Sequence, residues 1–244
     1  MAEKLDYGIH YSHWHDQSDE HAAQMRRQFL AELGVYLPEN RDTSALDIGC
    51  GMGFAMMALA DAGYRSVQGI DIDRSQIDAC QKRQLNVELV SDVETFLSGR
   101  PECFGLVTML DVLEHIPVHS QIDVLRAVFA ALKPQGRLIV QVPNANALLA
   151  ARWRYIDFTH TTSFTEHSIR FAILNSGFAS VQVPALGQPG ARPSLRLWAR
   201  RNRDYAKQWL VRWAWKKVLE VELGEDVSLI PLTLNLLAIA DKGS

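Results

Sequence analysis

Residues 46–53 have the sequence LDIGCGMG, in which an apolar strand leads directly into three glycines, Gly49, Gly51 and Gly53. A turn this sharp needs residues without a Cβ, because the chain must bend and a ligand must approach the backbone closely. The spacing is GxGxG, and it differs from the GxGxxG dinucleotide fingerprint because Phe54 occupies the position where a glycine would be needed. The stretch therefore predicts a strand, a ligand-binding turn and then a helix.

Two aspartates accompany this turn. Asp47 precedes the glycines and could accept hydrogen bonds through the loop. Asp71 follows 24 residues later, at the end of the next predicted strand, where a carboxylate can bind the hydroxyls of a ribose. The position of Asp71 favours a ligand that contains a ribose.

Outward from the turn, short apolar segments alternate with longer amphipathic ones between about residues 45 and 142. This alternation is typical of crossover units and predicts a parallel sheet with helices on both faces. The predicted strands are 45–48, 67–71, 87–90, 105–110 and 136–142, and the predicted helices are 54–62, 74–84 and 121–132. Ser18 and Thr165 are predicted caps of two flanking helices that end near Tyr36 and Asn175. Two apolar runs follow, at 179–183 and 234–240.

The composition limits the class of protein. A chain of 244 residues with 48% hydrophobic and 22% charged residues can bury one large core, and this composition excludes wholesale disorder. A formal net charge of -3 argues against coating nucleic acid through overall charge. The three cysteines stand far apart, which excludes a disulfide framework, a zinc knuckle and a cysteine-ligated iron–sulfur cluster. Because there is no apolar signal core and no apolar run of about 18 residues, we expect a cytoplasmic globular protein.

Five motifs in chain order resemble the class I S-adenosylmethionine-dependent methyltransferases. They are LDIGCGMG (46–53), GIDID (69–73), SD (91–92), DVLEHI (111–116) and LKPQGRLIVQVPN (132–144). The resemblance implies an α/β, Rossmann-like, doubly wound sheet of seven mostly parallel strands. It also implies a helical insert before the last strand, which would run antiparallel in the place of residues 234–240.

The same resemblance implies where the cofactor, S-adenosylmethionine, binds. The three glycines would pass under its methionine part, Asp71 would bind the ribose hydroxyls and Asp92 would meet the adenine amino group. Leu110 and Asp111 would lie near the sulfonium and the amino-acid end. The full predicted cofactor set is Asp47, Gly49, Gly51, Gly53, Asp71, Ile72, Asp92, Val93, Leu110 and Asp111. Asp73 is instead a predicted helix cap, because it directly precedes a helical segment.

Two histidine-containing segments concern the methyl acceptor. An alcohol is a poor nucleophile until its proton leaves, so a base or a metal ion must assist. If their segment is helical, Asp111, Glu114 and His115 share one face, and His160 lies in DFTHTTSFT (157–165), just after the core. We expect His160 and His115 to be the catalytic residues.

Metal-dependent relatives, among them small-RNA 2′-O-methyltransferases and ubiquinone-pathway O-methyltransferases, bind a divalent ion through a pattern of ExxEH and a later histidine. The resemblance implies a site for magnesium, manganese or zinc at Asp111, Glu114, His115 and His160. Asp111 departs from the pattern, because its side chain is one methylene shorter than that of glutamate. Two alternatives stay open: His160 as a metal-free general base, and histidines that only hold loops together.

Residues 191–223 form a basic segment rich in tryptophan. Between positions 192 and 217 there are nine lysines and arginines against one acid, Asp204, and four of the six tryptophans lie in this segment. If the segment is a helix, its apolar residues form a stripe along one side, and Trp215 falls outside this stripe. The stripe contains Leu195, Trp198, Tyr205, Trp209, Leu210 and Trp213. Three alternatives stay open: contact with an anionic membrane surface, a nucleic-acid groove, which is the least favoured, and packing on the chain's own domain or on a second copy.

We expect one methyltransferase domain over residues 1–244, built from four parts. They are an N-terminal lid and helix (1–40, with an aromatic segment at 7–15), the core (41–183), the basic insert (184–233) and the last strand (234–244). Contact of residues 192–217 with the inner face of the membrane, and a homodimer, are the two expected associations of the insert.

The stretch DFTHTTSFTEHSIRF after VPNAN, with the closing IPLTLNLLAIADK, resembles methyltransferases found with polysaccharide and lipopolysaccharide assembly. This resemblance implies O-methylation of a sugar hydroxyl on a glycan or glycolipid. One alternative is O-methylation of a small aromatic or quinone precursor. The other is a cofactor-binding protein without catalysis.

Overall fold

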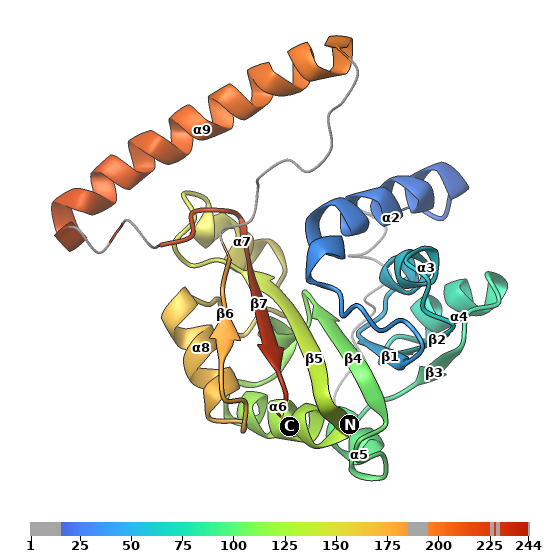
Figure 1. The fold of residues 1–244 in the computed structure, drawn as a ribbon. Helices are drawn as coiled ribbons and strands as arrows, with labels where there is room; N and C mark the ends of the chain where they lie inside the picture. The colour runs from blue at the N-terminus through green and yellow to red at the C-terminus, as the bar shows by residue number, and fades with distance from the viewer. Residues whose placement is uncertain (1–15, 185–194, 225–226, 228–229, 244) are drawn as a thin grey trace.

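The structure, a computed structural model, describes residues 16–184, 195–224, 227 and 230–243, with side chains left out at 195–206, 208 and 209. The aromatic segment predicted at 7–15 lies outside these residues. Seven strands form one sheet (Figure 1). The strands are β1 Ser44–Ile48, β2 Ser66–Asp71, β3 Val87–Leu89, β4 Phe104–Leu110, β5 Leu132–Pro143, β6 Val181–Gln182 and β7 Asn235–Asp241.

The strand order is β3-β2-β1-β4-β5-β7-β6. Strands β1 to β5 pair in parallel, whereas β7 pairs antiparallel with both β5 and β6. The predicted Rossmann-like sheet, with its last strand antiparallel, is therefore confirmed. The parallel crossovers bring the carboxyl ends of β1, β2 and β4 to the same edge of the sheet, which is where open α/β sheets bind ligands.

Helices cover both faces of the sheet. Helices α2 and α3 pack on one face, together with β-strand residues such as Leu106, Ile139 and Leu237, and α5, α6 and α8 pack on the other. The helices and helical turns are α2 Asp19–Leu33, η1 Gly34–Tyr36, α3 Phe54–Asp61, α4 Arg74–Lys82, α5 Val93–Ser98, η2 Leu113–His115, α6 Val118–Ala131, α7 Ala150–Ile156, α8 Glu166–Leu174 and α9 Leu195–Leu223. Neighbouring strand residues such as Leu138 and Leu236 point to the opposite face, because side chains alternate along a strand.

Three predicted helix caps are confirmed. Ser18 accepts a hydrogen bond from the His21 N–H at the start of α2, and Asp73 accepts one from the Ser75 N–H at the start of α4. Thr165 begins α8 through a reciprocal pair of hydrogen bonds with Ser168. Sequence analysis did not predict α5, α7 and η2, because seven residues or fewer show no helical period.

Helix α9 occupies the predicted insert between β6 and β7 and lies apart from the sheet, above α7 (Figure 1). Its Trp215 Nε1 donates a hydrogen bond to the backbone oxygen of Asn146 (2.8 Å). Leu210 and Trp213, the two residues of the predicted apolar stripe whose side chains are described, are exposed. The stripe therefore does not pack on the domain at these positions, and the contact comes from Trp215, which the stripe left out. Within the described residues, the search for a helix able to cross a bilayer finds none.

Candidate active site

The loop between β1 and α3 holds all three predicted glycines in the left-handed region, with φ of +70° at Gly49, +52° at Gly51 and +81° at Gly53. A Cβ at Gly49 would overlap the Val112 side chain, and a Cβ at Gly53 would overlap Leu85. Gly49 and Gly53 are therefore required both for backbone conformation and for space.

Asp71, at the end of β2, braces this loop. Its Oδ2 accepts a hydrogen bond from the Gly51 N–H (2.8 Å), and its Oδ1 accepts one from the Asp73 N–H (2.8 Å). Burial raises the pKa of Asp71, and these two hydrogen bonds oppose the rise. Its contact with ribose hydroxyls stays a prediction, and the carboxylate has a second role in fixing the glycine loop.

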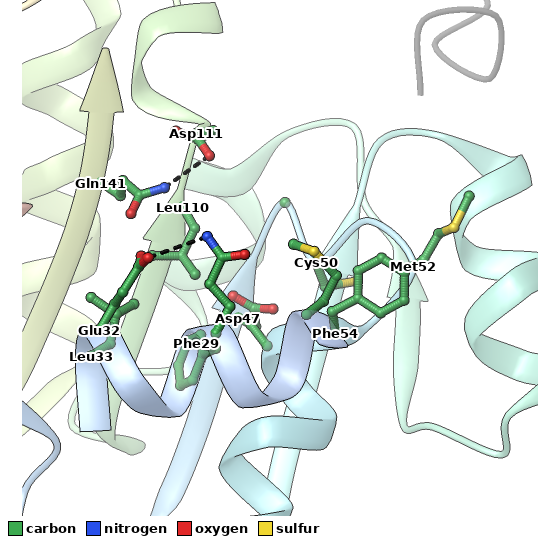
Figure 2. Close-up of a pocket in the computed structure, with 14 residues that line it drawn as sticks. Phe29, Glu32, Leu33, Asp47, Cys50, Met52, Phe54, Leu110, Asp111 and Gln141 are labelled. Carbon is green, nitrogen blue, oxygen red and sulfur yellow. Dashed lines mark hydrogen bonds between the residues drawn. The ribbon is translucent and has the colours of Figure 1, made fainter. Parts of the chain in front are cut away.

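A cavity of about 150 Å³ opens beside the loop, between α2 and the ends of β1 and β4 (Figure 2). Three carboxylates from separate elements line it: Glu32 on α2, Asp47 on β1 and Asp111 directly after β4. Lysine and arginine are absent among its described lining residues, so the cavity favours a positively charged ligand. The other lining residues are Met25, Gln28, Phe29, Leu33, Gly49, Cys50, Met52, Phe54, Ala55, Leu110 and Gln141.

Two of these carboxyls have perturbed pKa values. Burial raises the pKa of Asp47 to about 7, although the Thr108 hydroxyl donates a hydrogen bond to its Oδ1 (2.6 Å). The cavity walls desolvate Asp111, which still faces the open cavity, and raise its pKa to about 6, with the charge of Glu32 adding to the rise. The Gln141 amide, which donates to Asp111 Oδ2 (3.0 Å), opposes it. A bound cation would lower both pKa values, so its binding is linked to proton release.

The cavity lining includes part of the predicted cofactor set. Asp47, Gly49, Leu110 and Asp111 line it, whereas Gly51, Gly53, Asp71, Ile72, Asp92 and Val93 do not. Asp92 caps α5: its carboxylate accepts hydrogen bonds from the Thr95 N–H (3.1 Å) and hydroxyl (2.7 Å), which hold its pKa below the usual value. Contacts of Asp92, Val93 and Ile72 with the adenosine part stay predictions.

Sequence analysis missed the contribution of α2 to this cavity. Its cap and extent were predicted, but no local pattern shows that Glu32 and Gln28 face the glycine loop. Gln28 Nε2 donates a hydrogen bond to Glu32 Oε1 (3.2 Å), which orients the carboxylate (Figure 2). Packing of α2 on α3 brings both side chains to the cavity, and that packing depends on the whole fold.

On the acceptor side, the structure brings together Glu114, His115 and His160, which we name the Glu–His–His cluster. One ligand atom from each residue lies within 4.8 Å of the others, and the two imidazole ring centres are 4.7 Å apart. Asp111, the fourth predicted ligand, does not belong to this group. Asp111 has a φ of +55°, which is not helical, and η2 begins only at Leu113. Asp111 and Glu114 therefore do not share a helical face. The structure thus brings together three of the four predicted metal ligands, and metal binding stays a prediction.

Hydrogen bonds fix the orientation of both imidazoles. The Thr159 hydroxyl donates to Asp157 Oδ1 (2.6 Å), so its oxygen accepts from the Nδ1–H of His115 (2.8 Å). The Nδ1–H of His160 donates to the backbone oxygen of Trp153 (3.0 Å). In the neutral form, both histidines therefore carry their lone pair on Nε2, as metal-binding or proton-accepting histidines require.

Glu114 is the buried acid of the cluster. It is fully buried, and neither carboxylate oxygen has a hydrogen-bond partner among the described residues. His160 Nε2 lies 4.0 Å from Glu114 Oε1, and the two form an ion pair when the imidazole is protonated. Burial, above all, raises the pKa of Glu114 well above its usual value, and the charges of Asp111 and Asp157 add to the rise. Such a carboxyl fits either a cation or a proton held in the cluster.

The segment that carries His160 is held at both ends. Phe164 forms a β-bridge with Asn144, directly after β5, so the two ends of the segment 144–164 lie side by side. The Thr161 N–H and hydroxyl both donate to the backbone oxygen of Glu114 (2.7 and 2.8 Å), so the segment is fastened to η2. Asp157 and Thr159 were missed as site residues, although the spacing Asp-x-Thr is a signal for a local turn that orients the next side chain.

Comparison with known proteins gives a family and several relatives. The sequence pattern of a family described as a methyltransferase domain matches residues 18–183. The chain is 38% identical over 106 residues to a ubiquinone biosynthesis O-methyltransferase of Pseudomonas fluorescens, covering 41% of this chain and 44% of that relative. A ubiquinone biosynthesis O-methyltransferase of Idiomarina loihiensis is 32% identical over 107 residues. The chain thus matches less than half the length of these curated relatives.

Solved structures share the fold. A S-adenosylmethionine-dependent methyltransferase from Archaeoglobus fulgidus superposes with a TM-score of 0.64 at 20% identity, over 97% of this chain and 99% of the other. A phosphoethanolamine N-methyltransferase from Haemonchus contortus, in complex with S-adenosylmethionine, gives a TM-score of 0.58 at 18% identity, over 89% of this chain and 53% of the other. At these identities the likeness concerns the fold alone.

Proposed function

This chain belongs to the family of methyltransferase domains, whose cofactor is S-adenosylmethionine, and from that membership we propose that it transfers a methyl group to a hydroxyl oxygen. The observation that carries the proposal is the adjacency of two sites. Asp111 lines the acidic cavity, Glu114 enters the Glu–His–His cluster three residues later, and the charge of Asp111 raises the pKa of Glu114. The cavity suits a cationic cofactor, and the cluster suits a hydroxyl that must lose its proton.

On the cofactor side, acidic side chains and the glycine loop would bind the cofactor. When bound, S-adenosylmethionine supplies a methyl group on a sulfonium, which reacts by in-line displacement. Glu32, Asp47 and Asp111 would attract its positive charges, on the sulfonium and the amino group, because the described lining contributes acids without lysine or arginine. Gly49 allows the backbone turn to pack against Val112 beside the cavity, and residues of α2 line the cavity on one side.

On the acceptor side, His160 Nε2 is the atom that takes the hydroxyl proton. Its Nδ1–H stays bonded to the Trp153 carbonyl, and Glu114, 4.0 Å away, stabilises the imidazolium that results. His115, oriented through Thr159 and Asp157, faces the same space and would position the acceptor. This assignment needs only residues that the fold brings together.

The same cluster fits a divalent cation. The donor set consists of two imidazole Nε2 atoms and a buried carboxylate that has no hydrogen-bond partner within the described part of the chain, and zinc, manganese and magnesium accept such a set to different degrees. Glu114, His115 and His160 would hold the ion, which would lower the pKa of a bound hydroxyl. Neighbouring hydroxyls on the acceptor would then chelate it. As the methyl acceptor, the names of the curated relatives favour an aromatic ring hydroxyl over the sugar hydroxyl that the sequence predicts.

The experiment measures formation of S-adenosylhomocysteine with two probes, catechol and a methyl glycoside that carries a vicinal diol. Turnover with either probe supports an O-methyltransferase and its acceptor class. Loss of turnover with a chelator, restored by one divalent ion, supports the metal role, whereas insensitivity assigns His160 as a metal-free base. Cofactor binding by calorimetry without turnover on hydroxyl, amine or thiol probes would contradict the proposal and favour a binding protein without catalysis.

A further inference from the structure

The outer side of α9 is an exposed apolar face. Leu210, Val218 and Val221 lie at helical spacing i, i+8 and i+11, and Trp213 lies beside them, so they share one side of the helix. All four are exposed, from 47% at Trp213 to 82% at Val221. We call these four residues the α9 face. Monomeric proteins rarely expose such a stripe without a partner.

A fifth residue of α9, Trp215, meets the domain. Trp215 is half-buried and donates its hydrogen bond to the backbone oxygen of Asn146. Figure 1 shows the backbone of α9 lying apart from the sheet, and this contact joins it to the domain. The contact also places the helix at the beginning of the segment that carries the acceptor-side residues.

That segment has an exposed apolar ridge of its own. Leu148 and Leu149 precede α7, Tyr155 lies on it, and Phe158, which is 96% exposed, follows it two residues before His160. We call these four residues the α7 ridge. Hydrogen bonds from the Arg154 guanidinium to the Thr161 oxygen (2.8 Å) and from His160 to the Trp153 oxygen join the ridge to the Glu–His–His cluster. A surface that binds the ridge would therefore lie next to the acceptor site.

Charge identifies the partner. The segment 192–217 holds nine of the chain's 25 lysines and arginines and one of its 28 acids, so it carries a formal charge of +8 while the remainder carries -11. Two copies that meet through this segment would bring +8 against +8, whereas an anionic surface complements it. Lys207 and Lys217 are exposed on the same helix as the aliphatic residues Val218 and Val221, which suit the boundary of acyl chains better than stacked bases. Tryptophan with basic and aliphatic residues is the composition of interfacial helices.

We propose that the α9 face and the α7 ridge together form a docking surface for an anionic lipid layer, with the acceptor site held at that layer. The aliphatic and aromatic side chains enter the boundary between headgroups and acyl chains, and the lysines and arginines contact the lipid phosphates. Docking of this kind does not depend on which hydroxyl is methylated. It does place the Glu–His–His cluster within reach of an acceptor that is itself carried in the lipid layer.

The test is sedimentation of the full chain with vesicles of phosphatidylcholine alone or with added phosphatidylglycerol. Binding is expected only to the anionic vesicles and is expected to weaken with added salt. The variants Val218→Asp with Val221→Asp, and Phe158→Ser, should each weaken binding about tenfold or more, because they remove buried apolar contacts. Val35→Asp is the matched control, since Val35 is 80% exposed on η1, outside the docking surface, and its binding should not change.

Cofactor affinity, measured by calorimetry on the same variants, separates this proposal from the proposed function. Unchanged cofactor affinity with lost vesicle binding supports the docking surface. No binding to anionic vesicles, or binding that the α9 face and α7 ridge variants leave intact, overturns the docking surface and leaves the methyl transfer untouched. A dimer in solution, or binding to single-stranded RNA, that the same variants abolish would overturn it in favour of that partner.

Discussion

The two sides of the active site are built in different ways. The cofactor side rests on the backbone: three glycines with positive φ follow β1 within five residues, and Asp71 fixes them by accepting a hydrogen bond from Gly51. The acceptor side rests on side chains that come from η2 and from the segment before α8, joined by Thr161. A loop dictated by backbone conformation is visible in the sequence, whereas a side-chain cluster depends on contacts between distant segments.

The strongest test of this difference is His160→Ala. We expect turnover to fall by about 10²–10⁴-fold, because the group that takes or helps remove the acceptor proton is lost. Cofactor affinity should stay within about twofold, since His160 does not line the acidic cavity. Steady-state kinetics and calorimetry measure the two effects. His119→Ala, which removes an exposed histidine on α6, is the matched control, and equal activity in both variants would remove His160 from the mechanism.

The opposite result is expected for Gly49→Ala. The new Cβ would meet the Val112 side chain at a φ of +70°, so the variant should lose about 2–4 kcal/mol of unfolding free energy and bind the cofactor more weakly. Gly99→Ala is the control, because a Cβ there meets nothing within 4 Å. Chemical denaturation measures the stability. A Gly49→Ala protein as stable as Gly99→Ala, with unchanged cofactor affinity, would mean that the loop tolerates a side chain.

The same difference explains how much the sequence predicted. The strands, the order of the motifs and the caps at Ser18, Asp73 and Thr165 were predictable, because each depends on local period or local hydrogen bonding. The separation of Asp111 from the Glu–His–His cluster was not predictable, because it accompanies a positive φ at Asp111 and a hydrogen bond with Gln141 that local period does not reveal. The face that Glu32 presents to the cavity likewise depends on packing between α2 and α3.

The apolar stripe of α9 shows a further limit. Helical spacing alone groups apolar residues, but it does not tell whether a stripe is buried or exposed. Leu210 and Trp213 belong to the predicted stripe and are exposed, whereas Trp215 makes the contact with Asn146. The choice depends on where the helix is anchored, and that anchor is one hydrogen bond to a backbone oxygen far away in the sequence.

A smaller effect is expected for Thr159→Val, which removes the hydroxyl between His115 and Asp157. Turnover should fall by about 10–100-fold, because His115 loses the partner that fixes its tautomer and ring orientation. Thr159→Ser keeps the hydroxyl and should restore most of the activity. The pH profile of turnover is the decisive measurement, since it should shift in Thr159→Val only if the hydroxyl acts through the imidazole. Equal losses for valine and serine, without a shift, would mean that Thr159 only packs the loop.

The smallest effect concerns the cofactor side and its protons. Asp47 and Asp111, with pKa values of about 7 and about 6, carry protons at low pH, so the cavity gains negative charge as the pH rises through this range. The affinity for S-adenosylmethionine should therefore increase from about pH 5 to pH 7.5, by about tenfold for each pKa that the bound cation lowers by one unit. S-adenosylhomocysteine, which lacks the sulfonium charge, should show a shallower slope. Asp111→Asn should flatten the profile, whereas the exposed control Asp123→Asn should not. A pH-independent affinity in calorimetry would show that the acids of the cavity do not hold the cationic end of the cofactor.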